Sequence, residues 1–171
     1  MSDTYLTLKE TAEAQLTEKR SRFLAFALHV DDEAQAKEVA TQYKKKYYDA
    51  RHVGWAYVRG SPPNQTTRAQ DDGEPAGTAG RPILGQIVSR QLTYTMVVVV
   101  RYYGGVNLGT GGLIVAYRCA AANALAHATV EPRLVEDTIT YTFAYPMMNA
   151  VMRVIKEMQP RIVAQSFDNT C

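Results

Sequence analysis

The chain has 171 residues, of which 46% are hydrophobic and 21% are charged. This composition fits one folded domain, or one domain with a small partner, and it excludes wholesale disorder. The net charge of +2 does not by itself call for a nucleic acid as partner. No apolar run approaches the ~20 residues of a membrane span, the N-terminus lacks the pattern of a signal peptide, and two distant cysteines fit neither a zinc site nor a disulfide framework. We therefore expect a reduced, cytoplasmic protein with no metal, no cofactor and no membrane contact.

The first third of the chain alternates between strand and helix patterns. A short strand at 14–16 and a strong one at 23–30 are separated by a polar turn, which predicts a hairpin. Asp32 followed by Gln35 has the spacing of a capping box and predicts the start of a helix. Three lysines, Lys44–Lys46, end that helix. They lie there either because the helix dipole favours positive charge at its C-terminus or because they contact phosphate.

The middle of the chain begins with a third predicted strand at 53–58. His52, at its entry, has no neighbours at metal-ligand spacing, which favours a structural hydrogen bond. Residues 59–70 are rich in Gly, Ser, Pro and Asn and predict a surface loop. The next stretch, 71–82, has no periodicity but is dense in acidic residues and glycine, and Pro82 suits the first turn of a helix that ends near Arg90.

A strand is predicted at 94–101, and it contains four consecutive valines at 97–100. A run that is apolar at every position indicates a strand covered on both faces. Five glycines then fall within the nine residues 104–112, and an alanine-rich helix begins near Thr110. The residues Glu131-Pro132-Arg133 end this helix.

The last part of the chain reads as a strand, a helix and a strand, at 137–145, 147–159 and 161–167. A strand–helix–strand unit cannot bury its own sheet. We therefore expect a first domain at 1–134, and at 135–171 either half of a small α+β domain cut short or an arm packed on the first domain. The fold class expected is α+β, with a mixed sheet that carries its helices on one face.

Two stretches are candidates for chemistry, and the first is the acidic cluster Asp71, Asp72 and Glu74 beside Thr78. Three carboxylates on a short loop either bind Mg²⁺ or supply a general base. Alternatively, they cap the following helix and pair with an arginine such as Arg101.

The second candidate is the glycine-rich loop that leads into the helix near Thr110. Backbone amides at such a helix start form an anion site. The sequence Leu-Gly-Thr-Gly-Gly-Leu, however, lacks the Lys-Ser/Thr of a P-loop, and tight packing of the helix on the sheet explains the glycines equally well. No Ser-His-Asp or Cys-His set can be assembled from the three isolated histidines.

Together, the stretch 71–80 and the stretch 97–113 closely resemble the YigZ/Impact family, with Ser21-Arg22-Phe23 and Arg51-His52 as further matches. The resemblance is strong over about 20–134 and is of the bacterial YigZ type, with a second domain after the core. The positions of this chain that match the family motif are Asp71, Asp72, Gly73, Glu74, Pro75, Gly77, Arg101, Tyr102, Gly104, Gly105, Leu108, Gly109, Gly112 and Tyr117.

The resemblance implies the left-handed βαβ fold of a small-subunit ribosomal protein's second domain, followed by a ferredoxin-like domain similar to elongation factor G domain V. Residues 135–171 supply only the start of that second domain, which on this expectation is incomplete. Eukaryotic relatives restrain a translation-control kinase, and bacterial members are usually linked to nucleic acid or the ribosome. The resemblance brings no catalytic role.

We therefore expect a non-enzymatic, translation-associated regulatory protein that contacts RNA, the ribosome or a protein partner, in an oligomeric state that the sequence leaves open. The expected binding surface combines the two candidate stretches: Asp71, Asp72, Glu74, Thr78, Arg101, Tyr102, Gly104, Gly105, Gly109 and Gly112. The alternative is an enzyme that handles phosphate or nucleotides, with the glycine-rich loop holding phosphate and Asp72 or Glu74 holding Mg²⁺.

Overall fold

A computed structural model describes residues 3–168 of the chain. The chain divides into two compact units, with the boundary between Val135 and Glu136. We call them the first and the second unit. Within 3–168, no helix is long and apolar enough to cross a membrane.

The first unit is built on a five-stranded sheet in the order β2-β3-β6-β4-β5. The strands are β2 (Ala12–Glu18), β3 (Ser21–His29), β6 (Thr95–Tyr102), β4 (His52–Arg59) and β5 (Thr66–Gln70). The predicted hairpin is confirmed as β2–β3, and every neighbouring pair in the sheet is antiparallel. The expectation of a mixed sheet is therefore wrong.

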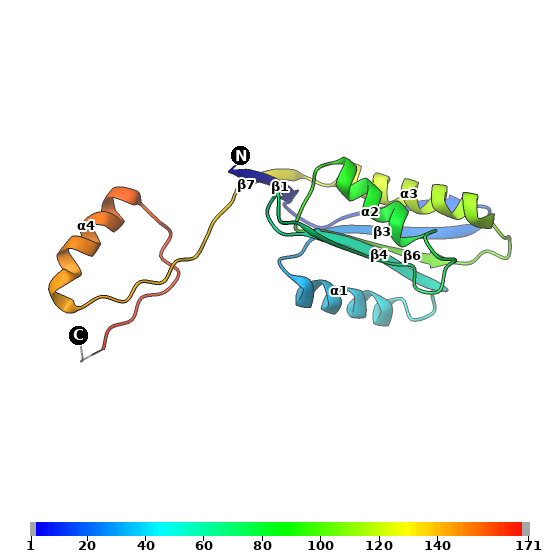
Figure 1. Cartoon of the computed structure of the whole chain (residues 1–171). Coiled ribbons are helices and arrows are strands. Elements are labelled where there is room, and N and C mark those ends of the chain that lie inside the picture. The colour runs from blue at the N-terminus through cyan, green and yellow to red at the C-terminus, as the bar shows by residue number, and fades with distance from the viewer. Residues whose placement is uncertain (1–2, 169–171) are drawn as a thin grey trace. The chain divides into compact units, whose positions relative to one another are not determined.

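The helices of the first unit cover both faces of this sheet (Figure 1). On one face α1 (Glu33–Lys46) packs against Met96, Val98 and Val100. On the other, α2 (Gly80–Ser89) and α3 (Gly109–His127) pack against the alternate valines of β6. The expectation of helices on one face is wrong, and the reason lies in β6, whose residues from Thr95 to Arg101 are all buried. Each face of the central strand needs its own apolar cover.

The predicted start of α1 is confirmed. The Asp32 carboxylate accepts a hydrogen bond from the Gln35 amide at 2.8 Å, and the Gln35 side chain accepts one from the Asp31 amide at 2.7 Å. Together they satisfy two backbone donors at the helix N-terminus that would otherwise lack partners. Lys44–Lys46 form the last turn of this helix, as predicted.

Three strands were not predicted from the sequence pattern. β5 lies within the expected loop 59–70, and all five of its residues are exposed, so it shows no alternation of apolar and polar residues. β1 (Thr4–Leu8) pairs with β7 (Val130–Leu134), which contains the residues expected only to end the helix. This two-stranded ribbon brings the beginning of the first unit against its end.

In the described part of the second unit, 136–168, a 3₁₀ turn (Tyr145–Met147) is followed by α4 (Met148–Met158). The predicted helix is confirmed, but the predicted strands at 137–145 and 161–167 are wrong, because neither segment has a hydrogen-bonded strand partner. A strand exists only as part of a sheet, and two strands beside one helix are marginal at best.

Candidate functional site

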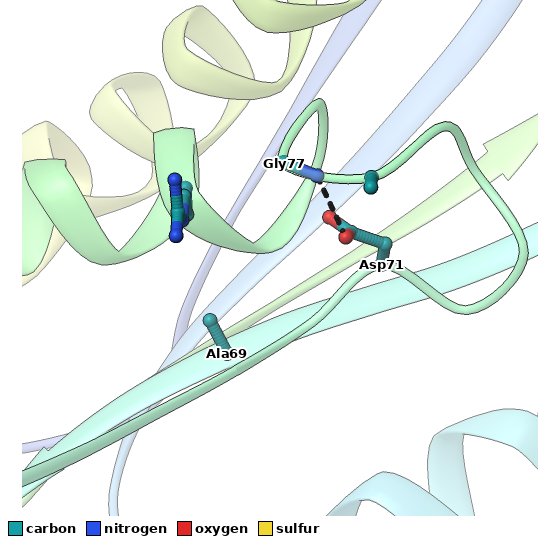
Figure 2. A pocket seen from close by; sticks show the side chains of 5 residues that line it. Ala69, Asp71 and Gly77 are labelled. Carbon is teal, nitrogen blue, oxygen red and sulfur yellow. Dashed lines mark hydrogen bonds between the residues drawn. The ribbon is translucent and has the colours of Figure 1, made fainter.

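The acidic loop, residues 71–78, joins β5 to α2, and its first carboxylate caps that helix. Asp71 accepts hydrogen bonds from the backbone amides of Gly77 at 2.9 Å, Ala79 at 3.1 Å and Gly80 at 2.8 Å. Figure 2 shows the bond to Gly77 beside a cleft of about 330 Å³. Burial alone would raise the pKa of Asp71, but the three amides and the nearby Arg81 outweigh it and hold that pKa below its usual value.

Asp72 connects the acidic loop to the sheet and to α1. Its side chain accepts a hydrogen bond from the Val53 amide at 2.8 Å and forms an ion pair with Lys44 at 2.5 Å. Its carbonyl oxygen lies 2.8 Å from Nδ1 of His52. Because a carbonyl only accepts, Nδ1 of His52 carries a proton. The structural hydrogen bond expected for His52 is confirmed.

Glu74 is buried in the core with Arg101. Its Oε1 accepts hydrogen bonds from Arg101 Nη1 at 2.6 Å and from the Tyr117 hydroxyl at 2.7 Å. The side chains of Arg101 and Glu74 are only 6% and 2% exposed. Burial and the Glu74 charge raise the pKa of Tyr117 far above its usual value. The expected pairing of Arg101 with an acid of this loop is confirmed for Glu74.

The three carboxylates therefore engage three different parts of the fold and do not converge on one point. Thr78 is also turned inward, with its hydroxyl donating to the Pro75 carbonyl at 2.6 Å. Within residues 3–168 no group of three or more His, Cys, Asp or Glu side chains is arranged to hold a metal ion. The geometry supports the capping and pairing alternative for this loop rather than the Mg²⁺ alternative.

The glycine loop, residues 103–112, consists of the connection from β6 to α3 and the first residues of α3, and it passes close to the turn between β2 and β3. A Cβ atom on Gly104 would lie 2.2 Å from the backbone of Arg20, so only glycine fits there. Gly109, the first residue of α3, has a φ of +73°, which favours glycine. Gly105 is exposed, and Gly112 lies in the first turn of α3.

A cleft of about 410 Å³ lies where the two loops meet. No side chain caps the N-terminus of α3. Amides in the first turn of a helix have no partner within the helix, and they carry a partial positive charge. The residues that line the cleft are Arg51, His52, Glu74, Pro75, Arg101, Tyr103, Asn107, Leu108, Gly109, Thr110 and Leu113.

The cleft lining includes an exposed arginine and an exposed tyrosine. The Arg51 guanidinium lies over the Tyr103 ring at 5.5 Å from its centre, and that ring is 41% exposed. Arg22 lies over the Tyr102 ring at 5.0 Å, but neither residue lines this cleft, and Tyr102 packs on the α1 side of the sheet. Because Glu74 neutralises Arg101, the exposed Arg51 is the cation that gives the cleft a net positive charge.

The model of the Impact N-terminal domain matches residues 19–125, more than half of the chain. The chain belongs to the IMPACT family. It is 36% identical over 159 residues to the IMPACT family member YvyE of Bacillus subtilis, covering 93% of this chain and 73% of that protein. It is 35% identical over 150 residues to YigZ of Escherichia coli, covering 87% and 74%. A crystal structure described only as that of a hypothetical protein matches with a TM-score of 0.82 and 30% identity, covering 98% of this chain and 82% of the other.

The structure divides the residues expected to form one binding surface on this IMPACT family member. Arg101 and Gly109 line the cleft together with Glu74, whereas Asp71 and Thr78 do not. Asn107 and Thr110 also line it, and they were missed because a polar residue between glycines gives no signal of its own. Tyr103 and Arg51 are exposed and adjacent to each other. An aromatic and a basic side chain are the types that a search of the sequence for binding residues would select.

Proposed function

We propose that the first unit is a non-enzymatic binding module for single-stranded RNA, with a phosphate group held in the cleft and bases stacked at its mouth. The observation that carries the proposal is the convergence of Arg51 and the uncapped α3 N-terminus on one cleft beside the exposed Tyr103.

The phosphate would interact with a positive charge and a set of oriented donors. Arg51 offers several N–H groups at the cleft, and the first turn of α3 offers backbone amides. Arg101 adds little net charge, because its guanidinium is already bonded to Glu74 and lies near Ser21. His52 lines the same cleft, with Nδ1 held by the Asp72 carbonyl and Nε2 at 3.7 Å from Oε2 of Glu74.

The bases would stack on Tyr103, the exposed tyrosine that lines the cleft. Aromatic rings bind bases without regard to sequence, because every base has a π face. Tyr103 is exposed, and its hydroxyl donates to Asn107 at 3.1 Å, which orients the ring. Tyr102 is not part of this stacking surface, because it packs on the α1 side of the sheet, where its hydroxyl donates to Asp49 at 2.9 Å. The cleft therefore favours a flexible single strand whose bases are free to leave a helix.

We further propose that this RNA belongs to the translation machinery, a link that rests on the family resemblance. The topology of the first unit supports this link to translation in part. β3 and β4 run parallel to each other on the two sides of β6, and α1 connects them, which makes a βαβ unit of the kind expected for the ribosomal-protein-like fold. That residues 135–171 belong to a ferredoxin-like domain also stays a proposal.

The competing proposal is an enzyme that handles phosphate, and the geometry of His52 is the observation that favours it. His52 lines the cleft with its Nδ1 held by the Asp72 carbonyl, and histidine is a common general base, although its Nε2 lies 3.7 Å from Oε2 of Glu74. The acids that would hold Mg²⁺ are, however, engaged elsewhere. A thermal shift of several degrees with ATP and Mg²⁺, absent with RNA, would favour the enzyme.

The test is fluorescence anisotropy of a labelled single-stranded RNA at two salt concentrations. Affinity should fall steeply as salt rises, and Arg51→Ala should weaken binding about tenfold and lower the salt dependence by about one phosphate contact. Arg90 is an exposed arginine at the C-terminal end of α2. Arg90→Ala is therefore the matched control and should bind RNA normally. Absence of binding at low salt, or an unchanged Arg51→Ala affinity, would overturn the proposal.

Stacking is tested separately with Tyr103. Tyr103→Leu should weaken RNA binding by roughly tenfold or more, because stacking contributes about 1–3 kcal/mol per base. Tyr103→Phe keeps the ring and should retain most of the affinity. Equal affinities of the two variants would show that the ring makes no contact with a base.

A further inference from the structure

The segment that ends α1 and leads to β4 concentrates positive charge. This segment, residues 44–51, which we call the basic turn, holds four basic residues and one acidic residue, whereas the whole chain has a net charge of only +2. Lys44 is engaged in its ion pair with Asp72, but Lys45 and Lys46 are exposed. The helix dipole accounts for a cation in the last turn of α1, and Lys44 supplies one. Two exposed lysines are therefore available for another role.

Tyr48 adds an exposed aromatic ring to the basic turn, because the residue is 85% exposed. The neighbouring Tyr43 and Tyr47 instead pack against Phe26 in the core beneath α1. Lys46 lies over the Tyr47 ring at 5.4 Å from its centre. Packing of α1 therefore does not explain the ring of Tyr48. An exposed aromatic ring beside exposed cations is the combination with which proteins stack single-stranded bases and neutralise the phosphates.

Two hydrogen bonds place the basic turn against the end of β6. The Arg51 amide donates to the Arg101 carbonyl at 2.9 Å. The Tyr102 hydroxyl donates to Asp49, the single acid of the basic turn, at 2.9 Å. β6 ends at Tyr102, and the glycine loop leaves from the same end of the sheet (Figure 1). The basic turn is therefore adjacent to the cleft, whose lining includes Arg51.

We propose that the RNA strand held at the cleft continues onto the basic turn, an inference that rests on the proposed function. Tyr48 stacks a second base, and Lys45 and Lys46 contact the phosphates beside it. Three residues of extended chain span at most about 11 Å, so the backbone of Tyr48 lies within that distance of Arg51. Because stacked nucleotides repeat about every 3.4 Å, the strand covers this distance in about three nucleotides. The binding site therefore takes a longer strand than the cleft alone can contact.

The combination of ring and cation at both places favours a nucleic-acid strand over an acidic protein surface. The cleft carries Tyr103 with Arg51, and the basic turn carries Tyr48 with two exposed lysines. An acidic protein surface needs only the cations. A single strand presents both a π face and a negative charge at every nucleotide, so it uses both kinds of side chain.

The test is fluorescence anisotropy with two labelled oligouridines, one of about three nucleotides and one of about ten, a length within the range that one small binding domain covers. The parent chain should bind the longer RNA about tenfold more tightly. Lys45→Ala/Lys46→Ala should weaken binding of the longer RNA about tenfold and lower its salt dependence by about two phosphate contacts, with little effect on the shorter RNA. Tyr48→Leu should weaken binding of the longer RNA roughly tenfold, and Tyr48→Phe should retain most of the affinity.

The matched control is Lys9→Ala/Lys37→Ala. It removes the same charge from two exposed lysines of the first unit that lie outside the basic turn. This variant should bind both RNAs like the parent chain.

Two results would overturn the inference. One is a parent chain that binds both RNAs equally well, and the other is a set of basic-turn variants that bind the longer RNA no more weakly than the control variant does. In either case the shorter RNA still binds and Arg51→Ala still weakens that binding, so the proposed function stands. If neither RNA binds at low salt, the proposed function fails and this inference fails with it.

Discussion

The acidic loop and the glycine loop carry most of the unusual residues of this chain, yet they use them in opposite ways. The acidic loop directs its carboxylates inward, to the start of α2, to β4 and to Arg101. The glycine loop leaves the α3 N-terminus without a side-chain cap beside the cleft. The contrast teaches that a motif rich in glycine and acidic residues marks a segment whose structure depends on those residues. Only the hydrogen-bond partners show whether its polar groups are still free to bind a ligand.

Glu74→Ala should produce the largest effect, because it removes the partner of a buried guanidinium. Loss of one member of a buried ion pair typically costs about 3–5 kcal/mol, so the free energy of unfolding measured in urea should fall by that order. Glu33→Ala removes an exposed carboxylate paired with Lys37 and Arg68 and should lower the free energy of unfolding far less, because water screens exposed ion pairs. Similar costs for the two variants would show that the acidic loop is not a buried structural element.

Gly104→Ala should come next, through overpacking. The new Cβ meets the Arg20 backbone rather than the end of a flexible side chain, so the glycine loop or the β2–β3 turn must move. Overpacking of this kind costs about 1–3 kcal/mol. Gly105→Ala tests the other source of constraint at this loop, because its Cβ meets no atom within 4 Å but its φ is +87°. The urea midpoints of both variants measure the costs.

Asp71→Ala should cost about 1–2 kcal/mol at neutral pH, as loss of a helix cap does. The pKa of Asp71 is lowered in the fold, so its stabilising effect is present above the ordinary carboxyl pKa and is lost as pH falls through the lower, folded value. The difference in unfolding free energy between wild type and variant should therefore shrink in acid. A constant difference from neutral to acid pH would contradict this role of the ionised carboxylate.

Arg51→Ala should have the smallest effect on stability, within about 0.5 kcal/mol, because the side chain is exposed. Together with its expected loss of RNA affinity, this result would separate binding from folding at the cleft. A large loss of stability would instead place Arg51 with the structural residues of the acidic loop.

The central features of the site were predictable because they leave strong signals. A buried strand ending in arginine needs a carboxylate, and only the acidic loop offered several, so the Arg101 pairing followed. Which acid would pair was not predictable, since Asp72 and Glu74 differ only in how the turn directs them. The two-sided helix cover was already implied by 97–100, where every position is apolar, although the overall fold expectation placed the helices on one face.

Other features lacked a local signal altogether. β5 is polar and fully exposed, and its strand state comes only from its hydrogen bonds to β4. The 137–145 segment shows the opposite case, because its alternation is strong but a strand partner is missing. Alternation measures the readiness of a segment to pair, whereas pairing itself depends on what else is within reach.

The ribbon of β1 and β7 also has a consequence for the order in which the chain acquires its structure. Thr4 pairs with Leu134, so the first strand of the chain gains its partner only after nearly the whole first unit has been synthesised. The β2–β3 hairpin, by contrast, needs only residues close to it in sequence. Contacts between distant residues form late because closing a long loop costs entropy. A nascent chain halted before Val130 would therefore leave Leu8, which is fully buried in the finished fold, without its strand partner.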